Sequence, residues 1–329
     1  MVRAIEKIDF VVLWVDDNDK EWLEEKAKFT KNADKTVEND KLYRDYGTFH
    51  YWFRMVEKHA PWVHKIHLVT NGQVPDWLDA AHPKLNLVKH ADFMPKEYLP
   101  TFNAAAIELN LHRIPELSEQ FVLFNDDMFL VNDVRPEDFF VDGKPKLMAV
   151  YNAIVPAEAF DQLLFNNVKL IKRHFPAKKA LKESPFKFFT FKYGKYLFKN
   201  IFLLPWDITG YHNPHLPAPI RKSTLDLLWT KEKETLGTAS CNHIRNYATD
   251  VNQYICHYWQ IETNQFEPFE QNKGAFLTIN EVGRLPRLFK SRKVKMICIN
   301  DTVDIDVENL KYLQDLLLKY YPVKSHFEK

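Results

Sequence analysis

Residues 8–19 read IDFVVLWVDDND, an apolar run that ends abruptly in acidic and amide side chains. Three later segments repeat this pattern, at 66–72, 121–127 and 294–304. Short runs rich in Val, Ile, Leu and Phe are typical of strands buried on both faces of a parallel sheet. Helical patterns lie between them, at 48–59 and 101–113. The alternation predicts an α/β fold with a doubly wound, mostly parallel sheet.

The polar residues that follow these strands are expected to share one rim of the sheet. In such sheets, ligands bind at the carboxyl ends of the parallel strands. Four strands with the same ending favour a common rim over the alternative, in which Asn and Asp only begin turns. Asp16, Asn71, Asn125 and Asn300 are therefore predicted to contact substrate.

The composition of the chain limits the kinds of ligand site that it can form. The chain has 329 residues, with 45 Lys and Arg against 44 Asp and Glu, and only eight glycines. The glycines are too widely spaced for a G-x-G-x-x-G turn or a P-loop, so bound phosphate would be held by side chains or a metal. The near-neutral net charge gives no indication of nucleic-acid binding. Three cysteines without a C-x-x-C pair, no secretory segment and no apolar run of spanning length predict reduced thiols in a cytoplasmic protein.

Asn125-Asp126-Asp127 is the sharpest local signal. Two adjacent carboxylates at a strand end can hold a divalent cation, and Mg²⁺ prefers oxygen ligands together with substrate phosphate. Asp126, Asp127 and Asp301 are the predicted ligands of Mg²⁺ or Mn²⁺. Taken alone, the acidic pair is equally compatible with a plain turn.

The helix predicted from Thr101 to Arg113 places Glu108 and His112 four residues apart on one face, with Leu111 in the opposite, buried stripe. A carboxylate beside an imidazole suits proton transfer or the orientation of a ligand. A surface Glu–His pair is, however, the more frequent outcome of this spacing. Arg113 adds a candidate phosphate clamp, because a guanidinium meets phosphate oxygens in bidentate geometry.

His212 and His215 lie in a proline-rich loop, GYHNPHLPAPI. No cysteine or third histidine stands at the spacing of a closed zinc site, which favours one catalytic histidine with a structural neighbour. Arg245 by itself is typical of a surface charge.

Residues 169–199 differ from the rest of the chain, with ten Lys or Arg, one acid and eight aromatic residues. This composition suits an anionic membrane surface or a polyanionic ligand, or else a solvated helical insertion whose aromatic residues pack on the main domain. The sequence favours neither. We expect a first part of the catalytic domain at 1–150, a helical basic and aromatic insertion at 151–210, and a second part at 211–329 that ends in a covering helix at 307–321.

Five stretches occur in a fixed order: IDFVVLWVDDND (8–19), RDYGTFHYWFRMVEKHAPWVHKIHLVTNGQVPDWL (44–78), LPTFNAAAIELNLHRIPELSEQFVLFNDDMFL (99–130), YHNPHL (211–216) and ICINDTVD (297–304). Together they resemble the conserved blocks of the Stealth family over nearly the whole chain. These are the bacterial capsular polysaccharide phosphotransferases, related to the animal N-acetylglucosamine-1-phosphotransferase. The resemblance implies a Rossmann-like fold of the nucleotide-sugar transferase type.

The resemblance also implies a reaction. A sugar-1-phosphate would pass from a nucleotide sugar to a hydroxyl of a growing capsular or cell-surface glycan, forming a phosphodiester and releasing a nucleoside monophosphate. The active-site residues of the family fall on Glu108, Asp127, His212 and Arg245. A cation on the acidic pair would bridge the diphosphate, the arginines would absorb developing charge, and His212 would be the general base.

Further residues are predicted to bind substrate beside the strand ends already given. They are Arg44, Asn103, His112, Arg113 and His215. Many family members have R-D-N-x-E-L-R where this chain has RDYGTFH at 44–50, a departure that concerns the donor sugar or the acceptor more than the reaction.

Two other functions stay open. A metal-dependent glycosyltransferase would attack the anomeric carbon and release a nucleoside diphosphate. A non-catalytic glycan-binding protein would not need Asp126, Asp127, Glu108 and His212 together. The expected partners are a nucleotide-sugar donor and a glycan acceptor, expected to be lipid-linked, with peripheral contact at the inner face of a membrane and no nucleic acid.

Overall fold

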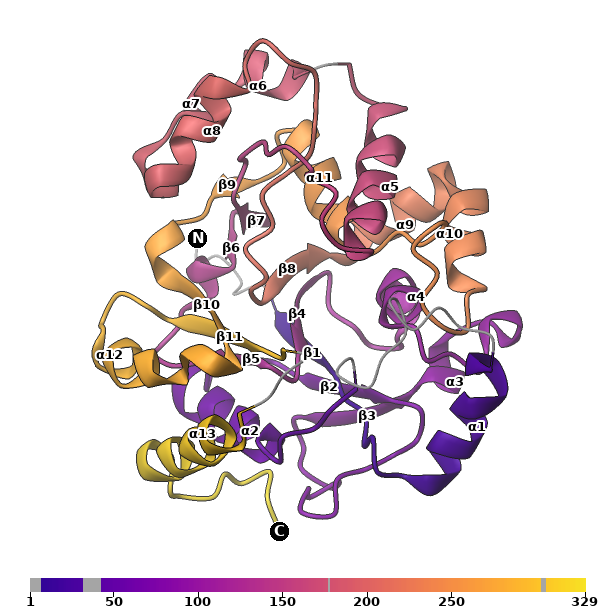
Figure 1. The fold of residues 1–329 in the computed structure, drawn as a ribbon, viewed down its shortest axis with the longest axis vertical. Helices are drawn as coiled ribbons and strands as arrows, with labels where there is room; N and C mark the ends of the chain where they lie inside the picture. Colours follow the sequence, from indigo (N-terminus) through magenta and orange to yellow (C-terminus); the bar gives the residue numbers. More distant parts are fainter. Residues whose placement is uncertain (1–6, 32–42, 177, 303–305) are drawn as a thin grey trace, which may run out of the picture.

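Apolar strands build a five-stranded central sheet in the computed structural model, which describes residues 7–31, 43–176, 178–302 and 306–329. In spatial order the strands are β3 (Leu85–Lys89), β2 (Ile66–Thr70), β1 (Ile8–Leu13), β4 (Gln120–Asn125) and β8 (Ala218–Arg221). The first four are parallel, and β8 runs antiparallel to β4 (Figure 1). The predicted α/β fold with a mostly parallel central sheet is confirmed.

The apolar run at 294–299 does not join this sheet, and in this respect the prediction was wrong. Its strand, β11 (Met296–Asn300), lies between β10 (Gly274–Thr278) and β5 (Met128–Leu130). It is parallel to β10 and antiparallel to β5. The place beside β4 in the central sheet is taken by β8, so β11 pairs with β5 instead. Because β5 begins directly after the acidic turn, the end of β11 still reaches it, and the Ile299 amide donates to the Asp127 carbonyl at 2.9 Å.

A third, small sheet contains β6 (Phe140–Val141), β7 (Lys144–Leu147) and β9 (Glu267–Pro268). The pairings of β4 with β8, β5 with β11 and β7 with β9 all join the region before residue 150 to the region after residue 211. Val303 and Asp304, which belong to the last of the five sequence blocks, lie outside the described residues.

The predicted helix at 48–59 is α2 (Phe49–His59), and it ends before Pro61. Its buried face carries Trp52 and Phe53, and the Trp52 ring meets Phe124 of β4 edge-on at 5.4 Å between centroids. The predicted C-terminal helix is α13 (Val307–Tyr320), capped by Asp306. Both predictions are confirmed.

The helix predicted from Thr101 begins later. It is α4 (Ala104–Asn110), continued by the 3₁₀ turn η3 (Leu111–Arg113). The Asn103 side chain accepts the Ala105 amide at 3.1 Å, so Asn103 is the N-cap of this helix.

The remaining elements connect and cover the sheets. The α-helices are α1 (Lys20–Thr30), α3 (His90–Phe93), α5 (Phe160–Lys172), α6 (Lys179–Glu183), α7 (Pro185–Phe188), α8 (Leu197–Phe202), α9 (Lys222–Lys231), α10 (Lys233–Ser240), α11 (Tyr254–Glu262) and α12 (Leu285–Lys290). The 3₁₀ turns are η2 (Lys96–Tyr98), η4 (Pro136–Asp138), η5 (Phe191–Tyr196), η6 (Gln271–Lys273) and η7 (Ile279–Arg284).

Residues 151–210 contain α5 to α8 and the turn η5. In Figure 1, α6, α7 and α8 lie together at the upper end of the molecule, and α13 lies at the lower end. The doubly wound arrangement and the status of this segment as an insertion stay predictions. Within the described residues, no helix combines the length and the apolar character needed to cross a bilayer.

Candidate functional site

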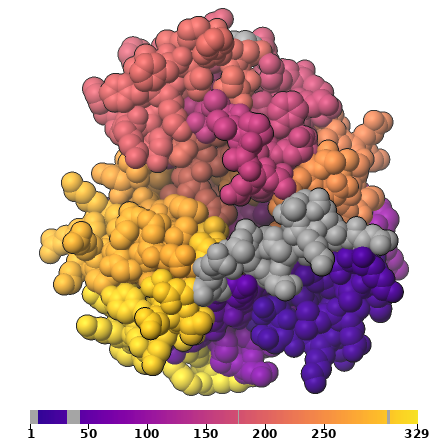
Figure 2. All heavy atoms as spheres, in the orientation of Figure 1, coloured from indigo at the N-terminus to yellow at the C-terminus, as the bar shows by residue number. Residues whose placement is uncertain are grey.

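A cleft of about 670 Å³ lies at the carboxyl ends of β1, β2 and β4. Its lining includes the end of β11 and the loops that precede β8 and α11. In Figure 2, the upper part of the molecule, which includes residues 151–210, lies above the indigo and yellow parts. Twelve of the residues predicted from the sequence line this cleft: Arg44, Asn71, Asn103, Glu108, Asn125, Asp126, Asp127, His212, His215, Arg245, Asn300 and Asp301. Most of the side chains that the sequence predicts at the site therefore line one cleft.

Two neighbouring carboxyl groups, those of Asp126 and Asp127, lie where β4 ends. Asp126 and Asp127 form the turn into β5, and burial raises the pKa of both. The charges of Asp127 and Asp45 raise the pKa of Asp126 further. The Oδ1 atom of Asp127 is buried and has no hydrogen-bond partner among the described residues. Carboxylates that are crowded and incompletely hydrogen-bonded carry a desolvation cost that a bound cation would relieve.

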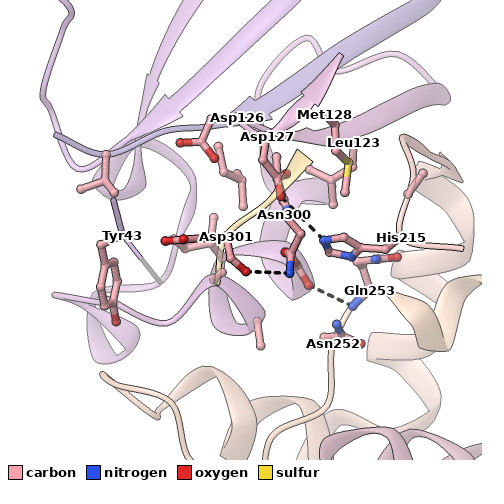
Figure 3. Close-up of a pocket in the computed structure, with 18 of the residues that line it drawn as sticks. Tyr43, Leu123, Asp126, Asp127, Met128, His215, Asn252, Gln253, Asn300 and Asp301 are labelled. Atoms are coloured by element: carbon pink, nitrogen blue, oxygen red, sulfur yellow. Dashed lines mark hydrogen bonds and ion pairs between the residues drawn. The ribbon is translucent and has the colours of Figure 1, made fainter. Parts of the chain in front are cut away.

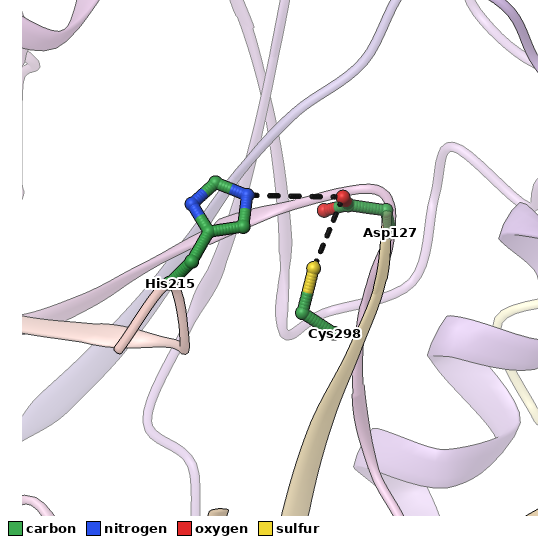
Figure 4. Close-up of side chains that lie close together, drawn as sticks. All are labelled: Asp127, His215 and Cys298. Atoms are coloured by element: carbon green, nitrogen blue, oxygen red, sulfur yellow. Dashed lines mark hydrogen bonds and ion pairs between the residues drawn. The ribbon is translucent and has the colours of Figure 1, made fainter. Parts of the chain in front are cut away.

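One cluster within the described residues could hold a metal ion. It consists of Asp127, His215 and Cys298, whose ligand atoms lie within 4.8 Å of one another (Figure 4). His215 Nε2 is 4.0 Å from Asp127 Oδ2, and the Cys298 thiol donates to the same oxygen at 3.2 Å. Burial raises the pKa of this thiol well above its usual value, which keeps sulfur protonated and in the role of a donor.

The predicted ligands Asp126 and Asp301 are not members of this cluster. Asp301 pairs instead with Arg44, whose Nη1 lies 3.1 Å from Oδ2. Figure 3 shows Asp126, Asp127 and Asp301 around the same space, with His215 facing Asp127. The oxygen-rich composition, with one imidazole beside it, suits Mg²⁺ or Mn²⁺ better than a thiolate metal.

His212 lines the cleft from the loop that precedes β8. Its amide donates to the Val150 carbonyl at 2.8 Å, and its ring stacks on Tyr196 of η5 at 4.1 Å between centroids. Burial lowers its pKa to about 4, and the charges of Lys199 and Lys195 act in the same direction. The imidazole is therefore neutral at pH 7 and can accept a proton.

Glu108 and His112 are both buried, so the alternative of an exposed surface pair is wrong. Glu108 projects into the cleft and accepts the Gln253 amide at 3.3 Å. Burial raises its pKa to about 7, while the Gln253 amide and the charge of Arg245 act against the rise. This carboxyl can change its protonation state near neutral pH.

Arg245 enters the cleft from the loop after α10. Its guanidinium carbon is 5.8 Å from the centre of the Tyr43 ring, and its buried Nη1 has no hydrogen-bond partner among the described residues. An unpartnered guanidinium nitrogen aimed into a cleft is suited to an anionic ligand. Nothing in the local sequence indicated that this arginine is more than a surface charge.

Asp250 fixes the loop that carries Arg245. It accepts hydrogen bonds from the side chains of Asn103 (3.1 Å) and Asn242 (2.6 Å) and from the Asn246 amide (2.8 Å). Asn103 thus uses its side-chain nitrogen on Asp250 and its side-chain oxygen to cap α4. Both ends of its amide are engaged inside the protein, and its predicted contact with substrate stays a prediction.

Three predicted substrate contacts do not line the cleft. His112 packs against Trp229, and Arg113 lies over the same ring at 4.7 Å. Asp16 exchanges hydrogen bonds with Gln73 through its backbone. His112 and Arg113 belong to η3, where the chain turns away from the cleft after α4, so Glu108 is inside and His112 is not.

The sequence pattern did not reveal several lining residues. Asp45, Gln253, Tyr254 and Cys298 all lie in or beside the cleft. Asp45 follows Arg44 in a block that the resemblance covers, which was the available signal. Gln253 contributes a backbone amide, which no side-chain motif can indicate.

Comparisons with known proteins identify the relatives of this chain. Models of Stealth protein conserved regions 1, 2 and 4 match residues 6–34, 42–147 and 286–329. The capsular polysaccharide phosphotransferase WcwK of Streptococcus pneumoniae is 42% identical, with 99% of this chain and 100% of the relative covered. The exopolysaccharide phosphotransferase cps2G of Lactiplantibacillus plantarum is 44% identical over 98% of this chain and 96% of its own length. The capsular polysaccharide phosphotransferase eps5J of Streptococcus thermophilus is 60% identical over 59% of this chain and 82% of its own.

Glu108 and Asp127 fall inside the conserved-region-2 match, and Asp301 falls inside the match to region 4. The full-length relatives extend the similarity across His212 and Arg245. The chain belongs to the Stealth family.

Proposed function

We propose that the protein is a polysaccharide phosphotransferase that transfers a sugar-1-phosphate from a nucleotide sugar to a glycan hydroxyl. The observation that carries the proposal is the meeting of Asp127, Glu108, His212 and Arg245 in one cleft, although they come from four separate segments of the chain. The names of the relatives supply the class of substrate. The transfer would form a phosphodiester and release a nucleoside monophosphate.

The site fits a divalent cation, Mg²⁺ or Mn²⁺. Asp127 would be the principal ligand because its buried Oδ1 has no partner among the described residues, and Asp126 and His215 stand beside it. Asp301, which is paired with Arg44, could join as a further ligand. When bound, the cation would neutralise charge on the donor diphosphate. Chelation should therefore abolish turnover, and Mg²⁺ or Mn²⁺ should restore it.

The other wall of the cleft would supply the proton acceptor and a fixed positive charge. His212, neutral at pH 7, would take the proton from the acceptor hydroxyl as that oxygen attacks phosphorus. Arg245 would stabilise negative charge on the transferred phosphoryl group with its unpartnered nitrogen. The bond that breaks joins the transferred phosphorus to the oxygen of the leaving nucleoside monophosphate, so the anomeric carbon–oxygen bond stays intact.

Glu108 would act on the Arg245 side chain and would not contact the phosphate. The positive charge of Arg245 favours the ionised form of the Glu108 carboxyl group. Ionised Glu108 would hold the Arg245 guanidinium in place, and protonation near pH 7 would release it. We assign it a positioning role with a pH dependence of its own.

The acceptor is proposed to be lipid-linked, so that the enzyme works beside the inner face of a membrane. The division of the chain into 1–150, 151–210 and 211–329 is kept as part of this proposal, with the middle segment serving the acceptor side.

The reaction is tested by incubating the protein with a panel of nucleotide sugars, Mg²⁺ and a glycan acceptor, and identifying the nucleotide released. The proposal expects UMP, CMP or GMP. Release of a nucleoside diphosphate would identify a glycosyltransferase instead. Metal-independent glycan binding without nucleotide release would identify a binding protein.

A further inference from the structure

The large apolar side chains in and just after the basic and aromatic segment divide into a buried and an exposed set in the structure. Phe188 and Tyr193 are fully buried, and Phe175, Phe189 and Tyr196 pack partly against the core. A second set is exposed, and it extends beyond residue 199: Phe186, Phe191, Phe198, Ile201, Phe202 and Trp206. We call these six residues the cap surface. The buried set fits a segment whose aromatic residues pack on the main domain, and the exposed set does not.

The cap surface stands on a rigid base. The Asn200 side chain donates to the carbonyls of Ala149 (2.8 Å) and Phe188 (2.9 Å) and accepts the Tyr151 amide at 2.7 Å. The Tyr193 hydroxyl donates to the Lys187 carbonyl at 2.7 Å. Asn200 of α8, Phe188 of α7 and Tyr193 of η5 are all fully buried. The exposed rings are therefore held outward by the fold rather than left over from an unpacked loop.

The exposure of these rings is high. Phe191 is 94% exposed, Phe186 88%, Phe202 74% and Trp206 62%. On α8, residues 198, 201 and 202 follow the i, i+3, i+4 spacing that puts side chains on one face of a helix. Large apolar side chains exposed to this degree on neighbouring elements mark a place where another apolar phase or partner is bound.

The charged residues around the cap surface indicate what it binds. Between residues 178 and 206 there are seven lysines and one acid, Glu183. Lys182 and Lys195 are exposed, and neither forms an ion pair within the described part of the chain. Aromatic side chains combined with lysines favour the interface of an anionic bilayer, where rings enter the headgroup region and ammonium groups meet lipid phosphate.

We propose that the cap surface docks the protein onto an anionic lipid bilayer. Tyr196, from the same η5 turn as Phe191, stacks on His212 at 4.1 Å between ring centroids. The docking surface is thereby joined directly to the acceptor side of the cleft. This purpose rests on the proposed function, because docking would bring a lipid-linked acceptor to His212.

The test compares the wild-type protein with a Phe191→Ser/Phe202→Ser/Trp206→Ser variant in sedimentation with phosphatidylcholine vesicles that contain or lack phosphatidylglycerol. A control variant, Leu318→Ser/Val323→Ser, removes exposed apolar residues near the C-terminus, away from the cap surface. We expect the wild-type protein and the control to bind the anionic vesicles at low salt, more weakly at high salt, and the triple variant to bind at least ~10-fold more weakly.

Wild-type protein that stays in the supernatant at low salt, or a triple variant that binds like the wild type, would overturn the proposal. So would a wild-type dimer that the triple variant converts to monomer, because the cap surface would then be an interface between copies of the chain. Nucleotide release with a short, water-soluble acceptor is measured in parallel and should be the same for all three proteins. Vesicle binding without any nucleotide release would refute the proposed function and leave the docking surface standing.

Discussion

The two walls of the cleft hold their functional side chains by different means. The strand-end wall comprises Asn125, Asp126, Asp127, Asn300 and Asp301, and the loop wall comprises His212, His215, Arg245 and Gln253. Strand-end side chains are positioned by the register of the sheets, as in the hydrogen bond from the Ile299 amide to the Asp127 carbonyl. The strand-end wall is mainly acidic, whereas the loop wall offers neutral imidazole and a guanidinium.

Long-range side-chain hydrogen bonds hold the loop wall. Glu262 accepts hydrogen bonds from the hydroxyls of Tyr151 (2.9 Å) and Tyr211 (2.8 Å), and Tyr211 immediately precedes His212. Asp250 holds the loop that carries Arg245 by accepting a hydrogen bond from the Asn246 amide. Under the proposed function, the strand-end wall supplies the carboxylate ligands of the metal, which His215 of the loop wall reaches, and the loop wall supplies the proton acceptor and the guanidinium.

Neutralising Asp127, the principal proposed metal ligand, should have the largest effect on turnover. Asp127→Asn keeps the size of the side chain but removes the charge, and we expect at least a ~10³-fold loss of turnover because the diphosphate charge is no longer neutralised. The melting temperature should be unchanged or higher, since a buried carboxylate is replaced by a neutral amide. Initial rates in Mg²⁺ and a thermal melt measure both, with the exposed Asp315→Asn as control. Activity close to the wild type would remove Asp127 from the metal site.

Removing the proton acceptor should have the next largest effect. His212→Ala is expected to lower turnover by ~10²–10³-fold, the usual contribution of a general base, without weakening the dependence on metal concentration. The exposed His326→Ala serves as control and should keep wild-type rates. A rate within twofold of the wild type for His212→Ala would show that the loop wall does not supply the base.

The two arginines that the sequence placed near phosphate can be compared directly. Arg245→Lys should cost ~10²-fold in kcat/KM, because a lysine offers a point charge instead of a planar fork. Arg113→Lys should stay within about twofold, because Arg113 lies on Trp229 outside the cleft. Equal losses in the two variants would contradict the separation that the structure shows.

Among the four residues proposed to act in the cleft, Glu108 is expected to show the smallest effect at neutral pH, as Glu108→Gln. With a pKa of about 7, the wild-type kcat/KM should rise with pH up to about 7 and then level off, since ionised Glu108 is the form that holds Arg245. Glu108→Gln should remove this limb and lower the plateau by about tenfold. A pH–rate profile that is unchanged by the substitution would contradict the role.

The same carboxyl gives a stability test. Its folded pKa lies above its usual value of 4.5, so the folded state binds more protons than the unfolded state between pH 4.5 and 7. Stability should therefore fall as pH rises through this window, and Glu108→Gln should be more stable than the wild type at pH 8, by an upper limit of about 3 kcal/mol. Denaturant unfolding at pH 5 and pH 8 measures this difference.

The strand-end wall could be predicted from the sequence because strand ends carry a local signal. An apolar run followed by Asn or Asp located Asn125, Asp126, Asp127 and Asn300 correctly on one rim. The pairing of β11 was not predictable in the same way, because it depends on which sheet edge is free and not on the run itself.

The loop wall was harder to predict. The spacing of Glu108 and His112 suggested a shared face, but the change from α4 to η3 after Asn110 separates them. Arg245 has no local pattern, and only the resemblance selected it over Arg113. Residues such as Asp250 and Glu262 act through partners more than 50 positions away, which a single sequence does not reveal.

The central claim is that the acceptor attacks phosphorus and leaves the anomeric bond intact. It is tested most directly with a nucleotide-sugar donor that carries ¹⁸O in the oxygen between the anomeric carbon and phosphorus. Mass spectrometry of the products after transfer should find the label in the glycan product, between sugar and phosphate, and the released nucleoside monophosphate unlabelled. Label recovered in a released nucleoside diphosphate would mean attack on the anomeric carbon and would contradict the account.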